Sequence, residues 1–283
     1  MMNKKKITFK KIPKNRILKP NVNNSKLTEE IFITDENNQK IKVHSIVEKP
    51  LTLYLNDQEI VTMMTIRDYP KYLAIGYLLN QNMLKKNDKI TGVDYDEEIN
   101  TVVVRTKLKT NYEEKLKKKT LTSGCAQGTI FGDIMEDFKK IQLSKSAKIK
   151  TSWLIKLLKE INTTPSLYLK ARAIHGCVLC KKDKIQVYME DVGRHNAVDK
   201  IAGYMYENSI KSSDKIFYTT GRLTSEMIIK TVKMRIPILI SRNGFTSWGV
   251  ELAKKSKLTL IGRTKGKRFV ALSGIHRIVY DKS

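Results

Sequence analysis

The chain has 283 residues, 41% of them hydrophobic, which is enough for one large or two modest domains with a buried core. No apolar run could cross a bilayer, and the first residues lack the apolar core of a signal peptide, so we expect a cytoplasmic protein without a membrane segment. Three cysteines are too few for a disulfide framework, which agrees with a reducing compartment.

The net charge of +26 favours acidic partners over long distances. Residues 1–28 contain many lysines and asparagines and no acid, and we therefore predict a basic, flexible arm over 1–40. A genome-wide bias toward Lys, Asn and Ile explains such an excess equally well. Aromatic residues make up only 7% of the chain, which argues against a nucleic-acid platform, and we expect no nucleic-acid partner.

Behind the arm, the pattern predicts a strand-rich subdomain over 41–108. It contains one expected helix around 71–79, with Pro70 suited to its first turn. The expected strands are 41–47, 51–55, 59–64 and 101–106. A Lys-rich, mobile loop over 109–128 follows, and residues 129–283 then form an α/β domain that begins with an amphipathic helix.

Cys125 in the loop is the candidate nucleophile or sulfur carrier. It lies between glycines, just before a predicted helix and shortly after several lysines. The N-terminus of the helix and the positive charge of the lysines both favour the thiolate over the thiol. An incidental exposed cysteine is the alternative. Cys177 and Cys180 lie in an apolar strand, where residues three apart point to opposite faces, so we expect core packing. A zinc or thiol-redox site that uses both cysteines with His175 is the rival interpretation.

The run from Glu190 to Lys200 joins a predicted strand to a predicted helix and is the most informative segment. Strand-to-helix turns in α/β proteins offer free N–H groups and the positive end of a helix dipole to anions. Gly193 permits a positive φ or a close backbone approach. The run therefore predicts a binding turn, with a purely structural turn as the alternative.

A regular strand-helix alternation follows, with strands expected at 215–218, 237–240 and 258–261. Consecutive βα units make parallel strands, so the three strand ends should open on one edge of a sheet. That edge would carry Arg222, Arg242, Arg263 and Lys265. The guanidinium group of arginine can donate two parallel hydrogen bonds to phosphate oxygens, and we therefore predict a phosphate-bearing ligand.

Together these motifs resemble the formate dehydrogenase accessory sulfurtransferase family, over about residues 48–280. The segments that carry the resemblance are Glu48 to Leu51, Ser123 to Cys125, Arg172 to His175, Glu190 to Lys200, Thr220 to Met227 and Ile236 to Ser247. The resemblance implies a cytidine-deaminase-like layered α/β fold with a C-terminal run of parallel βα units. It also implies a homodimer that accepts persulfide sulfur from a cysteine desulfurase. The recipient would be the molybdenum or tungsten bis-pterin guanine dinucleotide cofactor of formate dehydrogenase.

Residue by residue, Cys125 matches the family's persulfide cysteine. Many members have a second cysteine three positions later, where this chain has Gly128, so we expect a single-thiol carrier without an intrinsic metal. The segment 263–268 matches the family's cofactor-binding segment. The full set of predicted cofactor-binding residues is Gly193, Arg194, His195, Asn196, Arg222, Arg242, Arg263, Thr264, Lys265, Gly266, Lys267 and Arg268. The alternative function is a basic nucleotide- or nucleic-acid-binding module without sulfur chemistry.

Overall fold

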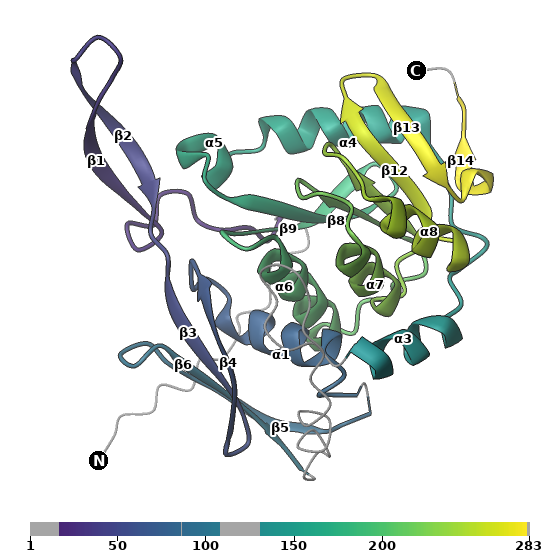
Figure 1. The fold of residues 1–283 in the computed structure, drawn as a ribbon, viewed down its shortest axis with the longest axis horizontal. Helices are drawn as coiled ribbons and strands as arrows, with labels where there is room; N and C mark the ends of the chain where they lie inside the picture. The colour runs from purple at the N-terminus through teal and green to yellow at the C-terminus, as the bar shows by residue number, and fades with distance from the viewer. Residues whose placement is uncertain (1–16, 86, 108–130, 282–283) are drawn as a thin grey trace.

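A six-stranded central sheet and a smaller four-stranded sheet form the framework of the protein (Figure 1). The computed structural model describes residues 17–85, 87–107 and 131–281. The mixed α/β class that the sequence predicts is confirmed, whereas the cytidine-deaminase-like layering stays a prediction. No helix within the described ranges is long and apolar enough to span a membrane.

The N-terminal part consists of a projecting hairpin and the four-stranded sheet. The hairpin pairs β1 (Thr28–Thr34) with β2 (Lys40–Ile46), so the predicted arm over 1–40 contains a strand and its boundary falls inside a hairpin. The sheet has the order β4-β3-β6-β5 and is covered by α1 (Pro70–Asn80). Its strands are β3 (Lys49–Leu55), β4 (Gln58–Thr65), β5 (Ile90–Asp96) and β6 (Thr101–Thr106).

The central sheet has the order β13-β12-β11-β10-β8-β9. Strands β10, β11 and β12 are parallel, as the sequence predicts, and β8, β9 and β13 extend the sheet through antiparallel pairs. The strands are β8 (His175–Lys181), β9 (Lys184–Asp191), β10 (Lys215–Thr219), β11 (Ile238–Ser241), β12 (Thr259–Lys265) and β13 (Arg268–Ser273). A hairpin rather than a helix follows β12, because Gly266 adopts a φ of +59° in the tight turn.

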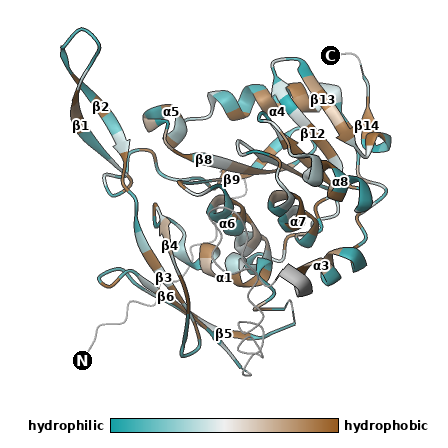
Figure 2. Ribbon diagram, in the orientation of Figure 1, coloured by the Kyte–Doolittle hydropathy of each residue, from teal (hydrophilic) through white to brown (hydrophobic). Residues whose placement is uncertain are grey.

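Helices cover both faces of the central sheet. One face packs against α3 (Phe131–Lys140), α6 (Arg194–Glu207), α7 (Ser225–Lys233) and α8 (Ser247–Lys255). The other face packs against α4 (Thr151–Thr163), beside the short α5 (Leu167–Ala171). A short helix (Ile275–Arg277) leads into β14 (Ile278–Val279), which pairs with β7 (Ile149–Lys150). Figure 2 shows the resulting pattern, with apolar residues along the sheet and polar residues on the outer sides of the helices.

Two glycines let α1 and α6 cross with their backbones in contact. A Cβ atom added to Gly203 would lie 1.9 Å from the carbonyl oxygen of Tyr72, and one added to Gly76 would lie 1.7 Å from that of Asp199. Since real Cβ atoms do not approach so closely, only glycine fits at either position. This crossing attaches the four-stranded sheet to the central domain.

Candidate functional site

The ends of five neighbouring strands meet along one edge of the central sheet, which we call the carboxyl edge. Strands β9, β10, β11 and β12 end there and β8 begins there, since His175 pairs with Asp191 and Cys177 pairs with Thr219. The prediction that Arg222, Arg242 and the Glu190 to Lys200 run share an edge is therefore confirmed.

Hydrogen bonds between neighbouring loops hold this edge together. The Ser241 hydroxyl donates to the Gly221 carbonyl at 2.6 Å, and the Leu223 N–H donates to the Gly244 carbonyl at 2.9 Å. The Arg263 N–H donates to the Asn243 carbonyl at 3.1 Å. The loops after β10 and β11 and the end of β12 are thus one connected surface that carries Arg222, Arg242 and Arg263.

The acidic residues of the Glu190 to Lys200 run have structural partners. Glu190 is buried and accepts the N–H groups of Leu167 and Tyr168 at 2.8 and 2.9 Å, which holds the first turn of α5. Burial raises the pKa of Glu190 in spite of these bonds. Asp199 binds the ammonium group of Lys230 at 2.7 Å. These carboxylates serve the fold, a role that the spacing in the sequence did not reveal.

Asp191 and Lys200 form a fully buried ion pair at 2.6 Å that ties the two parts of the chain together. Asp191 also accepts the Thr65 hydroxyl of β4 at 2.5 Å, and Lys200 contacts Asp68 just before α1. Burial raises the pKa of Asp68 to about 6. For Lys200, burial opposes the charged form, but Asp191 and Asp68 outweigh it and raise the pKa. The pair therefore locks the N-terminal sheet onto the carboxyl edge.

His195 faces a cavity of about 530 Å³ between β4, α6 and α7. Its Nε2 lies 3.0 Å from Oε2 of Glu226, although neither ring nitrogen makes a well-aligned hydrogen bond within the described residues. Burial lowers the pKa of His195, and Glu226 acts in the opposite direction. A mostly neutral imidazole beside a carboxylate can accept and return a proton near pH 7. Sequence reasoning missed Glu226, which lies 31 positions after its partner.

Asn196 and Gly193 shape the mouth of this cavity. The Asn196 amide donates to the Met64 carbonyl at 2.8 Å and to Asp191 at 3.1 Å, so it joins β4 to the turn. Gly193 has a φ of −90°, so the turn does not use the positive φ that glycine permits. A Cβ at Gly193 would instead lie 3.0 Å from the side-chain amide nitrogen of Asn196, so the turn leaves little room for a larger residue.

A cluster of cations surrounds His175 on the carboxyl edge. Burial lowers the pKa of His175, and Arg194, Arg242 and Arg222 lower it further through their charges. The Arg194 side chain packs beside Gly221, where an added Cβ would lie 3.1 Å from its Cδ. The structure thus brings together three of the predicted arginines: Arg194 at the start of α6, and Arg222 and Arg242 in the loops after β10 and β11. Such a cluster can bind phosphate oxygens through several guanidinium groups at once.

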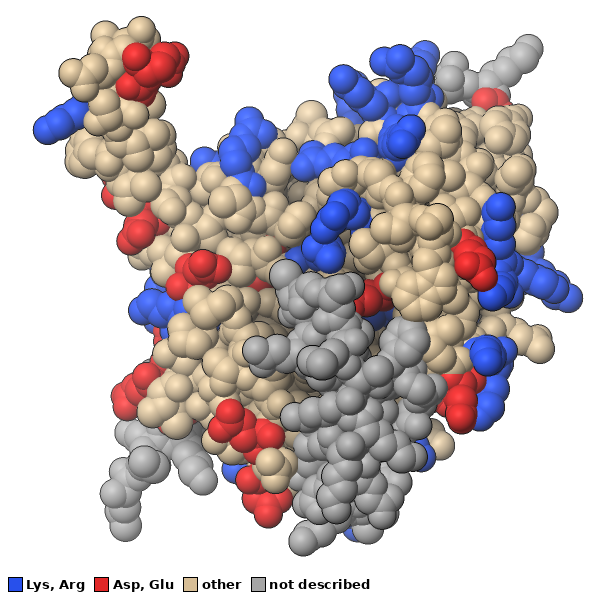
Figure 3. All heavy atoms as spheres, in the orientation of Figure 1, with Lys and Arg blue, Asp and Glu red and all other residues tan. Residues whose placement is uncertain are grey.

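Two further residues extend this cluster. The Arg242 guanidinium lies 4.6 Å from the ring centre of Tyr168, and the Arg172 guanidinium lies 5.3 Å from it. Arg242 lowers the pKa of the Tyr168 hydroxyl through a hydrogen bond. Figure 3 shows Lys and Arg side chains gathered over α5 and the β12–β13 hairpin. Arg172 lies within a segment that the family resemblance uses, whereas no motif in the sequence marks Tyr168.

The predicted segment 263–268 forms the end of β12, a tight turn and the start of β13. Arg263 lies 5.0 Å from the ring centre of Phe245 and has a positive φ of 51°. The buried Thr264 hydroxyl has no hydrogen-bond partner within the described part of the chain. Lys265, Lys267 and Arg268 extend from the hairpin into solvent. This basic hairpin continues the carboxyl edge on the side away from His195.

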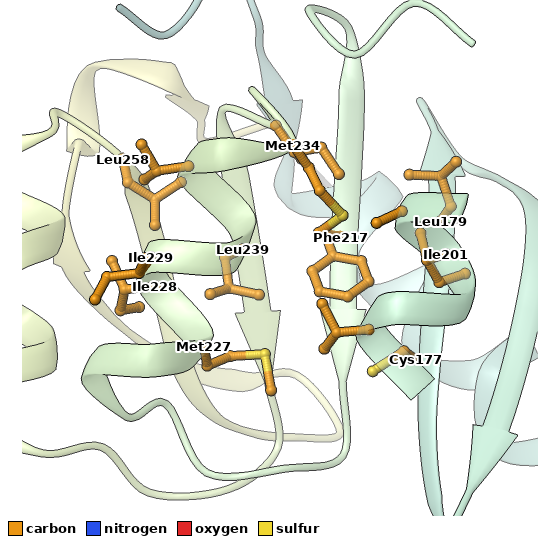
Figure 4. Close-up of a cluster of buried hydrophobic side chains, with 14 of the residues drawn as sticks. Cys177, Leu179, Ile201, Phe217, Met227, Ile228, Ile229, Met234, Leu239 and Leu258 are labelled. Atoms are coloured by element: carbon orange, nitrogen blue, oxygen red, sulfur yellow. The ribbon is translucent and has the colours of Figure 1, made fainter. Parts of the chain in front are cut away.

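Of the three cysteines, two are buried in β8 and one lies outside the described residues. Cys125 lies outside the described residues, and its assignment stays a prediction. Cys177 and Cys180 lie on opposite faces of β8, as predicted, and are buried in two different hydrophobic clusters. Cys177 packs near Ile201 and Phe217 (Figure 4), where burial raises its pKa to about 12. Neither thiol is placed to share a metal or a disulfide with the other.

The chain is similar in sequence to proteins of one known family. A family model described as the FdhD/NarQ family matches residues 46–279. A sulfur carrier protein FdhD of Listeria monocytogenes serotype 4b is 28% identical over 243 residues, which covers 85% of this chain and 93% of the relative. The protein of the same name from Bacillus subtilis is 27% identical over 241 residues, covering 84% and 92%.

A solved structure gives the same result for the fold. The crystal structure, described as a formate dehydrogenase accessory protein from Desulfotalea psychrophila, superposes with a TM-score of 0.72 at 25% identity. The superposition covers 89% of this chain and 99% of the other. Since the family model spans most of the chain, both sheets included, this chain belongs to the FdhD/NarQ family.

Proposed function

We propose that this chain is a sulfurtransferase that takes persulfide sulfur from a cysteine desulfurase and transfers it to the bis-pterin guanine dinucleotide cofactor of molybdenum or tungsten. The relatives named sulfur carrier protein FdhD support a role in carrying sulfur, and the related formate dehydrogenase accessory protein supports formate dehydrogenase as the partner that this role serves. The observation that carries the proposal is the meeting of strand ends at one edge of the sheet, which places Arg194, Arg222 and Arg242 on the side of His175 and beside the cavity of His195.

In the loading step, the Cys125 thiolate attacks the outer sulfur of the desulfurase persulfide. A new S–S bond forms on Cys125, the old S–S bond breaks, and the desulfurase cysteine leaves as a thiolate. No external oxidant or reductant is needed, because the step is an exchange between two cysteines. The attacking group must be the thiolate, and we assign the task of accepting the Cys125 proton to the pair of His195 and Glu226.

The carboxyl edge suits the cofactor as a bound substrate. Each guanine dinucleotide carries a pyrophosphate, and Arg194, Arg222 and Arg242 present guanidinium groups that match its oxygens. The basic hairpin with Arg263 and Arg268 would extend the contact to the second nucleotide. The His195 cavity, with apolar side chains such as Met63 and Ile229 on its wall, lies at the other end of this surface.

The proposal is tested by mass spectrometry of the intact protein after incubation with a cysteine desulfurase and cysteine. We expect the wild-type protein to gain one sulfur on the peptide that contains Cys125 and to lose it on reduction. The Cys125→Ala variant should gain none and should still bind guanosine diphosphate with unchanged affinity. Sulfur carried by Cys177 or Cys180 instead, or retained transfer by the variant, would contradict the proposal.

A further inference from the structure

A groove of about 560 Å³ lies between α3 and α8, and Figure 1 shows α3 below α8 at the side of the molecule. On each helix the groove is lined by residues three or four positions apart, which share one face of a helix. They are Met135, Phe138 and Lys139 on α3 and Trp248, Leu252 and Lys255 on α8. Two such stripes form an elongated surface into which a third helix can pack.

The floor of the groove is apolar. Phe138, Leu143 and Leu252 line it, are almost fully buried and belong to the hydrophobic cluster of the central sheet. Met135 is half-buried, and Trp248 is 43% exposed. Tryptophan is among the residues that contribute most to protein interfaces, so Trp248 suits the role of an anchor for a partner.

The rim of the groove is basic. Lys139, Lys145 and Lys257 are exposed, and none of them has an acidic partner in the part of the chain that the structure describes. The fourth lysine, Lys255, binds Glu251 at 2.7 Å. None of the described residues that line the groove is acidic. The complementary ligand is therefore an acidic segment with apolar side chains along one face.

The hollow shape of this surface favours a protein over a membrane. Anionic headgroups attract lysines, but apolar residues contribute to membrane binding only when they reach the acyl boundary. In this groove the apolar side chains form the floor and the lysines form the rim, so a flat bilayer could not reach the floor. An amphipathic helix of a partner protein can reach both at once.

The position of α3 indicates which partner protein the groove serves. Ile134 of α3 lines the His195 cavity, and the next residue, Met135, lines the groove. In the sequence, α3 is the first described helix after Cys125. Lys257 precedes β12, so this end of the groove lies away from the carboxyl edge. A protein in the groove therefore contacts the helix beside the proton-accepting cavity and leaves the carboxyl edge open for the cofactor.

We infer that the groove between α3 and α8 docks the sulfur donor through an acidic amphipathic helix of that protein. The inference rests on the proposed function, because it assigns a surface to the cysteine desulfurase that loads the carrier. Donor and cofactor would then bind at separate places, so neither has to leave before the other arrives.

The kinetics of sulfur loading by the cysteine desulfurase of the same organism test this inference. Lys145→Glu with Lys257→Glu reverses two charges on the rim. We expect the KM of the chain as sulfur acceptor to rise at least about tenfold, while the rate at saturation changes less than about twofold. Circular dichroism verifies the fold, and the affinity for guanosine diphosphate should not change.

The matched control is Lys182→Glu with Lys184→Glu at the turn between β8 and β9. It changes the net charge by the same amount, and β9 is at the opposite edge of the central sheet from β12 and β13. The KM of this control should stay within about twofold of the wild-type value at 150 mM salt, where distant charges are screened.

Fluorine nuclear magnetic resonance detects the contact itself. The chain has two tryptophans, Trp248 in the groove and Trp153 on α4, which packs against the other face of the central sheet. After labelling with 5-fluorotryptophan, titration with unlabelled desulfurase should shift the signal of Trp248. The signal of Trp153 should stay in place and serves as the internal control.

Several outcomes would overturn the inference. An equal KM in the groove variant and its control, or an unshifted Trp248 signal, would mean that the donor docks elsewhere. A Trp248 signal that shifts with phosphatidylserine vesicles, or with the concentration of the labelled chain alone, would assign the groove to a membrane or to a second copy. A wild-type chain that accepts no sulfur at all would instead overturn the proposed function, and this inference with it.

Discussion

Residues of the Glu190 to Lys200 run have different roles: some stabilise the fold, and one faces the cavity. Asp191 is fully buried and binds Lys200, Thr65 and Asn196, so its role is to hold two parts of the chain together. His195 faces the cavity, and its burial favours the neutral imidazole. The same short run thus supplies both the mechanical support of the site and its titratable group.

Nuclear magnetic resonance can follow His195 directly, because the chain has only four histidines. Glu226 and Lys230 face it from α7, and Arg194 adjoins it on α6. Glu226 is the group that raises the pKa of His195, so Glu226→Gln should lower that pKa further below the ordinary value. The matched control is Glu251→Gln on the exposed side of α8, which should not change it. An unchanged or higher pKa in Glu226→Gln would refute the pairing.

The lowered pKa of His195 also makes the stability of the fold depend on pH. The folded chain holds His195 with a pKa below the ordinary value of 6.5, so the unfolded chain binds the proton more readily. The stabilisation associated with neutral His195 is therefore present above pH 6.5 and is lost as the pH falls through the folded pKa.

At the level of the elements, local sequence patterns predict the helices and strands that have strong hydrophobic periodicity. The strands around 215–218 and 237–240 are short apolar runs that end in small residues, and they fold as predicted. The strand β5 was not predicted, because Gly92 and two aspartates give it low strand propensity, and it forms through pairing with β6. The contact of His195 with Glu226 depends on how α6 and α7 pack, which no local pattern encodes.

The crossing of α1 and α6 gives a prediction at this scale. Gly203→Ala would place a Cβ 1.9 Å from the Tyr72 carbonyl, so the helices must separate or the chain must lose packing on both sides. We expect the free energy of unfolding to fall by about 3 kcal/mol, measured by urea denaturation. The control is Gly92→Ala in β5, where an added Cβ meets nothing within 4 Å. Equal stability of the two variants would show that the helices are not in backbone contact.

For the whole molecule, the question is whether the strong positive charge acts as a diffuse field or as a defined site. A net charge of +26 attracts any polyanion at low ionic strength, without a preferred location. The carboxyl edge differs from the rest of the surface because its arginines come from loops that hydrogen-bond to one another. Lysines at the other end of the sheet, such as Lys184 at the start of β9, have the same charge without this arrangement.

Affinity for guanosine diphosphate separates the two possibilities. Arg242→Gln removes a guanidinium that lies over Tyr168 beside His175, and we expect it to raise the dissociation constant at least about tenfold, measured by isothermal titration calorimetry. Lys184→Gln removes the same charge at the opposite edge and should change the dissociation constant less than about twofold at 150 mM salt, where distant charges are screened. Equal losses in the two variants would mean that the ligand responds to the net charge alone. A loss confined to Arg242→Gln would place the phosphate contacts on the carboxyl edge, because only a fixed guanidinium in contact with the ligand resists screening.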